Sequence, residues 1–305
     1  MLKDIGLSSP RVKVVVRNDI AAMSDMLLSR GPSGLELGIS PRPHRSVTRA
    51  KAVPFLYYFS QCDLTVTQVT CNTSDGNLPS EARFSYSSFS EHVIPLPDLY
   101  FFQSGGYSAL RDLVSKNPKP WHERSGDIVW RGAPNGNGYL SFAPEIRNHP
   151  TLRQRIRMAW ICRDSEVDFR FVFPEHEKDA AVAQRAGFVG TRIPSDQWIG
   201  KKYAIDIDGF SNAWDNFYHR LLMGCCVLKV QSDFGFRQWY YGELKPFVHY
   251  VPVKADMSDF FEKVDWVRSN PQQAGSIASA GQAMANSLTF ESEIARAARL
   301  MKQYA

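Results

Sequence analysis

A glycine turn between a strand and a helix is the first stretch of this sequence that could bind a ligand. Residues 203–207 (YAIDI) alternate like a strand that enters a core, and Asp208 and Gly209 end it with a turn pair. Asn212 could cap the helix that follows, with Asp215 completing a box-like pair. Because a helix N-terminus attracts anions, the stretch predicts either an anion site or an ordinary β-α-β unit without a ligand.

A second candidate is the loop 131–138 (RGAPNGNG), which follows a short strand expected at 128–130. Its three glycines and two asparagines make it flexible and rich in donors, but it is neither a P-loop nor a GxGxxG motif. Arg131 at its base could hold a phosphate with two N–H groups. The helix expected at 152–162 is basic as well, with Arg153, Arg155 and Arg157.

The loop 71–80 (CNTSDGNLPS) carries one carboxylate, Asp75, just after a strand expected at 64–70. Ligands of open α/β sheets bind at such strand ends, although Asp-Gly is also a common turn pair. Residues 92–107 then form a rigid apolar loop with prolines, aromatics and Gly105-Gly106. Its aromatic side chains could contact the C–H face of a sugar ring or fill the core.

The elements around these loops indicate an α/β protein, because strands that alternate with helices predict parallel sheets. A strand and a helix are expected over 12–30, a polar loop over 31–51, and a domain boundary in the proline-bearing segment 116–126. Further strands are expected at 55–60, 167–173, 225–230 and 248–253. Further helices are expected at 107–115, 180–186, 258–268, 271–287 and 290–304.

Length and composition indicate a globular chain of about two domains, or one large α/β domain. Of the 305 residues, 44% are hydrophobic and 22% charged. No apolar run approaches the roughly 18 residues of a membrane helix, and charges interrupt the N-terminus, so we expect a cytoplasmic protein. The five cysteines are odd in number and form no CxxC pair, which favours buried reduced thiols.

The net charge of +5 suits an anionic ligand or surface without requiring nucleic acid. The basic segment 31–51 could touch a membrane surface or a phosphorylated acceptor, or be a solvated loop. The motifs HExxH and GxSxG and an EF-hand loop are absent from the sequence. The dipeptides His122-Glu123 and His176-Glu177 are read as surface residues, so no metal is expected.

Three segments occur in an order that resembles glycosyltransferase family 90: VWRGA at 129–133, YAIDIDGFSNAWD at 203–215 and LKPFVHYVPVKADMSDF at 244–260. The resemblance covers roughly residues 60 to 300. This family includes eukaryotic protein O-glucosyltransferases, fungal capsule xylosyltransferases and bacterial lipopolysaccharide-core enzymes. The resemblance implies a GT-B fold, with two Rossmann-like domains that face each other across a cleft. The expected division is 1–122, 123–285 and a C-terminal helix, 286–305, that returns to the N-terminal domain.

The resemblance also implies an inverting, metal-independent transfer from a UDP-sugar, without any cofactor, to a hydroxyl of an acceptor. The pattern Asn-x-x-Asp at 72–75 matches the family's general base, so Asp75 is the candidate. The donor-binding positions that it implies are Arg131, Gly132, Ala133, Arg155, Asp208, Gly209, Phe210, Ser211 and Asn212. The positions that it implies along the sugar and the acceptor are Asp98, Tyr100, Phe102, Gly105 and Gly106.

One departure concerns the diphosphate helix, where Ala213-Trp214-Asp215 stand in place of the family's arginine. Arg155 or Arg157 could compensate, and the departure favours the bacterial branch. The expected acceptor is then a lipopolysaccharide core or another surface polysaccharide, with peripheral contact at the inner membrane. The alternatives are a protein O-glycosyltransferase, a non-catalytic sugar-nucleotide or glycan-binding protein, and a basic nucleic-acid-binding protein. The donor sugar stays open among glucose, xylose and galactose.

Overall fold

The computed structural model describes residues 5–8, 10–43, 45–174 and 179–305, with the side chains of 45–49 excepted. His176 and Glu177, and part of the basic segment 31–51, lie outside this description. The chain divides into two compact units. Unit 1 comprises Met1–Ser108, Phe234–Gly242 and Leu288–Ala305, and unit 2 comprises Ala109–Asp233 and Glu243–Ser287. The expected division was instead at residues 122 and 285, because the polar, proline-bearing segment 116–126 suggested a linker.

Unit 1 contains a six-stranded mixed sheet in the order β1-β3-β2-β4-β5-β7. Strand β2 is antiparallel to both of its neighbours, and the other pairs are parallel. The helices of this unit include α1 (Arg45–Ser60) and α10 (Phe290–Tyr304), which pack against each other, and the short α2 (Leu99–Gln103). The strands of the sheet are β1 (Val12–Val16), β2 (Asp25–Gly31), β3 (Gly34–Ile39), β4 (Gln68–Asn72), β5 (Phe84–Ser85) and β7 (Ile94–Pro95). A separate pair joins β6 (Ser87–Ser88) to β12 (Arg237–Gln238).

The first 60 residues differ from the prediction. The expected helix within 12–30 and the expected loop over 31–51 are wrong, because β2 and β3 form a hairpin there, followed by the start of α1. The expected strand at 55–60 is also wrong, since these residues end α1. Phe55, Tyr58 and Phe59 are fully buried, and their spacing of three and four residues is that of one helix face.

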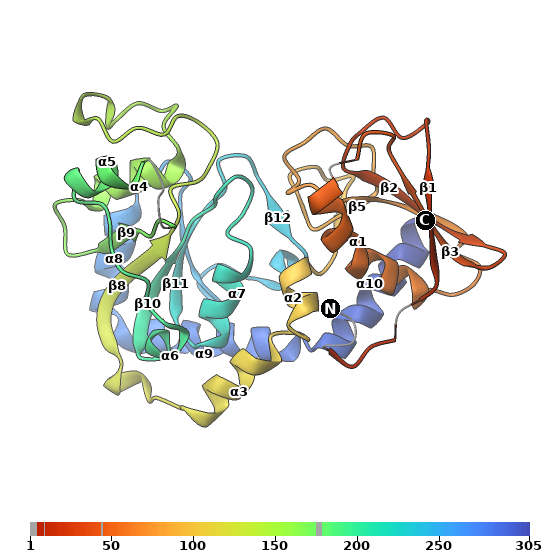
Figure 1. Ribbon diagram of the computed structural model, residues 1–305. Helices are drawn as coiled ribbons and strands as arrows, with labels where there is room; N and C mark the ends of the chain where they lie inside the picture. The colour runs from red at the N-terminus through yellow and green to blue at the C-terminus, as the bar shows by residue number, and fades with distance from the viewer. Residues whose placement is uncertain (1–4, 9, 44, 175–178) are drawn as a thin grey trace. The chain divides into compact units, whose positions relative to one another are not determined.

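Unit 2 contains a five-stranded sheet in the order β13-β11-β10-β8-β9, in which every pair is parallel (Figure 1). The predicted parallel sheet is confirmed here. The strands are β8 (Ser125–Gly132), β9 (Asp168–Phe171), β10 (Lys201–Asp206), β11 (Cys226–Val230) and β13 (Val251–Val253). The helices are α3 (Ser108–Lys116), α4 (Gln154–Cys162), α5 (Ala180–Arg185), α6 (Ser195–Trp198), α7 (Asp215–Leu222), α8 (Phe260–Ser269) and α9 (Pro271–Ser287).

The strand order of unit 2 reverses between β8 and β10. From β8 the chain first builds β9 on one side, then returns to the other side and adds β10, β11 and β13 in turn. Open parallel sheets bind ligands outside the carboxyl ends of their strands at such a switch point. The segments that leave these two ends are the loop 132–138 and the turn 207–212, called the switch loops below.

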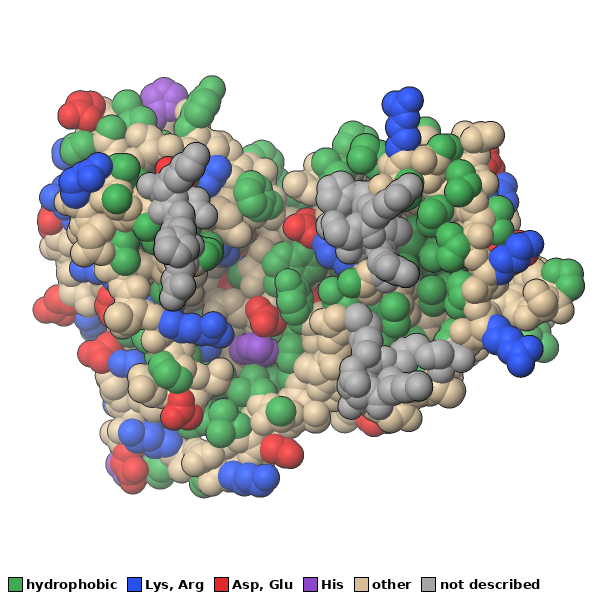
Figure 2. All heavy atoms as spheres, in the orientation of Figure 1, with side chains coloured by type: hydrophobic (Ala, Val, Ile, Leu, Met, Phe, Trp, Pro, Cys, Tyr) green, Lys and Arg blue, Asp and Glu red, His purple; other side chains and the backbone are tan. Residues whose placement is uncertain are grey.

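The cysteines, the helices and the surface charges bear on three further predictions. All five cysteines are unpaired and buried, which confirms the predicted buried thiols. Across the described helices, none combines the length and the apolar character that crossing a membrane requires. On the face drawn in Figure 2, Lys and Arg side chains are scattered among other types and form no continuous stripe. That face therefore gives no support to nucleic-acid binding.

Candidate functional site

The two switch loops contact each other directly. Asn137 Nδ2 donates a hydrogen bond of 2.7 Å to the carbonyl oxygen of Phe210. A Cβ added at Gly209 would lie 2.8 Å from Asn135 Oδ1, so a larger residue there would require the Asn135 side chain to shift. The structure therefore brings together the two loops that the sequence proposed separately.

Arg155, on α4, donates hydrogen bonds to both switch loops. Its guanidinium donates to the carbonyl oxygens of Ala133 and Ile207, each at 3.0 Å, and also to Asn135 Oδ1. It lies 5.2 Å above the ring of Trp130 and is only 7% exposed. Burial lowers the pKa of Arg155 to about 10. It remains a cation at neutral pH, and these bonds hold the loops in place.

Beneath the turn lies a buried ion cluster that the sequence analysis did not predict. Lys229 Nζ on β11 lies 2.9 Å from Asp206 Oδ2 and 2.8 Å from Asp208 Oδ1. All three side chains are at most 7% exposed. Burial opposes the charge of Lys229, but Asp206 and Asp208 outweigh burial and raise its pKa. Asp208 thus anchors the turn through Lys229, in addition to its predicted place at the donor site.

The remainder of the turn leads into α7, which begins at Asp215. The prediction that Asn212 caps this helix is wrong, because Trp214 occupies the cap position and provides no side-chain cap. Trp214 has φ +52, which is a rare and strained conformation for a bulky residue. Ser211 and Asn212 are both buried. Among the described residues, Ser211 Oγ has no hydrogen-bond partner.

Arg131, predicted to bind phosphate, uses most of its donors within the protein. Its Nη2 lies 2.6 Å from Asp168 Oδ2, and its Nη1 donates to the carbonyl oxygens of Trp130 and Asp168. Its Nε donates to the Thr191 carbonyl oxygen at 2.9 Å. Four of its five N–H groups are therefore engaged. Phosphate binding by Arg131 stays a prediction, and this bonding does not favour it.

The buried His219 on α7 leads us to expect that the protein becomes less stable as the pH falls. Burial, with Arg220 nearby, lowers the pKa of His219 to about 4 against the opposing effect of Asp215. The unfolded chain therefore takes up a proton first as the pH falls from about 6.5 to 4. We expect the free energy of unfolding to fall over this window by up to about 1.4 kcal/mol per pH unit from this group. Denaturation curves of the wild type and His219→Gln should show a shallower fall in the variant, and equal slopes would contradict this.

In unit 1, Asp75 lies in the loop after β4. Its Oδ1 is 2.5 Å from Lys51 Nζ, and its side chain is 36% exposed. Asn72 Oδ1 accepts a hydrogen bond from the Ser74 backbone at 2.8 Å, which forms a tight turn just before Asp75. Gly76 follows with φ +85, and a Cβ there would lie 2.2 Å from the Ser87 carbonyl oxygen. The position of Asp75 is thus fixed on both sides.

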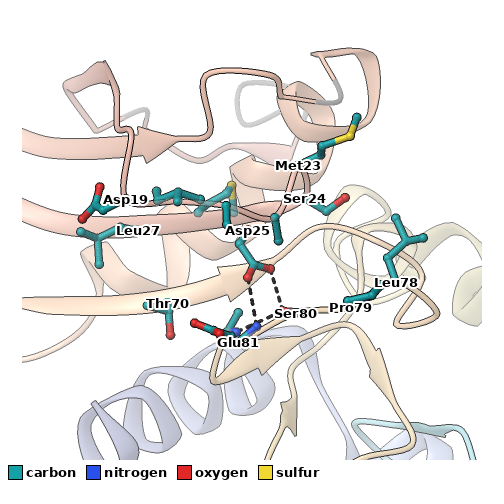
Figure 3. A pocket seen from close by; sticks show the side chains of 15 residues that line it. Asp19, Met23, Ser24, Asp25, Leu27, Thr70, Leu78, Pro79, Ser80 and Glu81 are labelled. Carbon is teal, nitrogen blue, oxygen red and sulfur yellow. Dashed lines mark hydrogen bonds between the residues drawn. The ribbon is translucent and has the colours of Figure 1, made fainter.

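Asp25 on β2 anchors both ends of this loop, and Figure 3 shows its bonds at the end formed by Ser80 and Glu81. Its Oδ1 accepts hydrogen bonds from Asn72 Nδ2 at 2.5 Å and Ser80 Oγ at 2.6 Å, and its Oδ2 accepts one from the Glu81 backbone at 3.1 Å. Asp25, Ser80 and Glu81 also line a cavity of about 670 Å³ between segments 19–27 and 78–82. Asp25 was missed because it stands in a segment read as a helix.

The predicted sugar and acceptor loop, 98–106, also lies in unit 1. Asp98 caps α2 by accepting from the Tyr100 and Phe101 backbones, and its other oxygen accepts from Gln238 and Trp239. Its carboxylate is buried, and Phe102 is fully buried against aromatic neighbours, so both have structural contacts here. Tyr100 is 46% exposed. Gly105 and Gly106 have φ +57 and +72, as the end of this short helix requires.

Comparison with known proteins bears on these features. Residues 84–305 match the sequence model of Glycosyl transferase family 90. The chain belongs to glycosyltransferase family 90. The matched residues include both switch loops and exclude Asp75, which precedes them.

This family 90 chain is 33% identical over 248 residues to "Protein O-glucosyltransferase 3" of Homo sapiens, covering 80% of the chain and 45% of that protein. It is 31% identical over 181 residues to "Uncharacterized protein 179R" of Invertebrate iridescent virus 6, covering 52% of the chain and 15% of that protein. The chain thus spans less than half the length of these two relatives. A solved structure, Anabaena Alr3699/HepE in complex with UDP and glucose, gives a TM-score of 0.37 at 13% identity, with 64% of this chain and 51% of that chain covered. A likeness this low carries no weight here.

Proposed function

We propose that this chain transfers a hexose or pentose from a UDP-sugar to an acceptor hydroxyl. The observation that carries the proposal is the pair of switch loops at the reversal of the parallel sheet, in a chain of glycosyltransferase family 90. Such a point is where open α/β sheets bind nucleotides. The GT-B arrangement of two Rossmann-like domains is part of the proposal. Unit 2 has the parallel sheet that this needs, whereas the sheet of unit 1 is mixed.

The proposed chemistry is a single inverting displacement. The acceptor oxygen forms a bond to the anomeric carbon of the sugar while the bond from that carbon to UDP breaks. The electron pair of the broken bond goes to the diphosphate, and the acceptor proton goes to Asp75 as general base. The proposed reaction uses no metal. Protein cations and backbone N–H groups of the turn 207–212 instead stabilise the negative charge that develops on the departing diphosphate.

A test of this function combines binding and turnover. Calorimetry should show UDP binding to the chain, and UDP release from a UDP-sugar should rise when an acceptor is added and persist in EDTA. A screen of UDP-glucose, UDP-xylose and UDP-galactose identifies the donor. Absence of UDP binding would overturn the proposal. UDP binding without release under any donor and acceptor would instead favour the non-catalytic sugar-nucleotide-binding alternative, to which the Asp75–Lys51 ion pair also lends support.

For the acceptor we propose a surface glycan such as lipopolysaccharide core. The similarity to protein O-glucosyltransferase 3 favours a second candidate, a protein hydroxyl. Release assays with glycan acceptors and with folded protein acceptors separate the two. The bacterial branch, the cytoplasmic location and contact with the inner membrane stay predictions.

Asp25→Ala should displace Asp75, the proposed general base, and should leave the proposed donor site in unit 2 unchanged. Removal of its carboxylate deletes the bonds to Asn72, Ser80 and Glu81 that hold the loop of Asp75. Since a misplacement of about 1 Å can cost about 100-fold in rate, we expect kcat to fall by about 10- to 100-fold with UDP affinity unchanged. Asp19→Ala is the matched control, because Asp19 lines the same cavity but pairs with Arg17 at the surface. An unchanged kcat for Asp25→Ala would contradict the anchoring role.

A further inference from the structure

We propose that Arg153 is the cation that binds the diphosphate at the switch loops. The inference rests on the proposed function and adds to it, because neither the predicted site nor the resemblance included this residue at the donor site. It also answers how the site neutralises an anion when the first turn of α7 carries a carboxylate, Asp215, instead of a cation.

The backbone fixes Arg153 beside the first switch loop. Its N–H donates to the Tyr139 carbonyl oxygen at 3.1 Å, and the Tyr139 N–H donates to the Thr151 carbonyl oxygen at 2.8 Å. Gly138, with φ +103, makes this pairing possible, since a Cβ there would lie 2.4 Å from the Thr151 carbonyl oxygen. Arg153 is then the N-cap residue of α4, with φ −50 and ψ 137. Its side chain therefore starts from a defined point on the loop.

The side chain of Arg153 reaches both switch loops. Its Nη1 donates to the Pro134 carbonyl oxygen at 2.9 Å, and its Nε donates to the Gly138 carbonyl oxygen at 3.3 Å. The guanidinium carbon lies 5.9 Å from the centroid of the Phe210 ring, which is 42% exposed. The charge is thus held where the loop 132–138 meets the turn 207–212.

The other nearby cations already have strong partners. Arg131 pairs with Asp168, Arg157 pairs with Asp233 at 2.6 Å, and Lys229 pairs with two aspartates. Arg155 is buried and bonds the two loops.

Arg153 differs from these cations in two ways. Unlike Arg131, Arg157 and Lys229, it has no ion pair with a carboxylate within the described chain. Unlike Arg155, whose Nη1 and Nη2 both bond the loops, it has an Nη2 without a hydrogen-bond partner among the described residues. A guanidinium with unused N–H groups suits bidentate recognition of phosphate.

The test compares UDP, UMP, uridine and inorganic pyrophosphate by calorimetry. Arg153→Met should weaken binding of UDP and of pyrophosphate by about 10- to 100-fold, as expected for the loss of a charge-assisted hydrogen bond. Uridine affinity should stay within about twofold, and the salt dependence of UDP binding should become shallower. Arg153→Lys should recover part of the lost affinity, because it restores the charge without the planar fork. Arg147→Met, at an exposed arginine of the same unit, is the matched control and should leave all four affinities unchanged.

Specific results would overturn the inference. An equal loss of UDP and uridine affinity in Arg153→Met would show that Arg153 shapes the loop or the base site. Unchanged UDP and pyrophosphate affinity would remove Arg153 from the phosphate site. If the wild type binds pyrophosphate through Arg153 but does not bind UDP, the inference stands and the proposed function fails. If the wild type binds neither, both fail.

Discussion

Asp75→Asn is expected to retain UDP binding while lowering turnover by about 10²–10⁴-fold, the usual effect of losing a general base. Asparagine keeps the size of the side chain but cannot accept the acceptor proton. The residues of the proposed donor site belong to unit 2 and Asp75 belongs to unit 1, so UDP affinity should be unchanged. Turnover is measured as acceptor-dependent UDP release, and affinity by calorimetry.

The ion pair with Lys51 gives a matched control for this variant. If Asp75 mattered only through its ion pair with Lys51, then Lys51→Met, which breaks the same pair, would cause the same loss of turnover. As the base, Asp75 should make Asp75→Asn far more damaging than Lys51→Met. Equal losses in the two variants, or turnover near that of the wild type in Asp75→Asn, would exclude Asp75 as the base.

Lys229→Met is expected to lower the free energy of unfolding of unit 2 by about 3–5 kcal/mol, because it leaves two buried carboxylates without their cation. Asp206 and Asp208 are 0% and 6% exposed at the side chain, so water cannot replace the lysine. Denaturation followed by tryptophan fluorescence reports on unit 2, which holds six of the seven tryptophans.

The control for Lys229→Met removes the charges together. In the triple variant Asp206→Asn, Asp208→Asn and Lys229→Met, no uncompensated charge is left, so stability should lie much nearer to that of the wild type. If the triple variant lost at least as much stability as Lys229→Met alone, the cost would come from packing and not from the unpaired charges.

The sequence predicted unit 2 well and the start of unit 1 poorly. In unit 2 the strands are short apolar or alternating runs bounded by turn residues, and the longer helices repeat apolar residues at helical spacing, so local patterns located most of them. The helix expected at 271–287 is α9 with the same bounds. In unit 1 the hairpin of β2 and β3 turns at Gly31 and Gly34, and this segment was read as a loop. Pairing between strands was required to recognise it, and a single sequence does not show pairing.

The sequence predicted where the loops of the candidate site lie but not which hydrogen bonds and ion pairs their side chains form. Glycines and asparagines identified both switch loops, because such loops need these residues. Whether each charged side chain is free to bind a ligand depends on ion-pair partners that lie far along the chain. Arg131, for example, pairs with Asp168. Lys229 did leave one signal, since it is a lone charge in the apolar run 225–230 (CCVLKV), and a lysine is seldom buried without a partner.

The division of the chain into units has a consequence for synthesis on the ribosome. Unit 1 needs three separate segments, of which the last, Leu288–Ala305, is made after all of unit 2. In it, α10 covers α1, and Cys62 Sγ lies 3.5 Å from the Ala298 carbonyl oxygen across 236 residues of sequence. Unit 1 must therefore remain incomplete, with apolar surface of α1 uncovered, while unit 2 is translated. Neither unit is one continuous stretch of chain, so a fragment cut at a single point would lack part of unit 1.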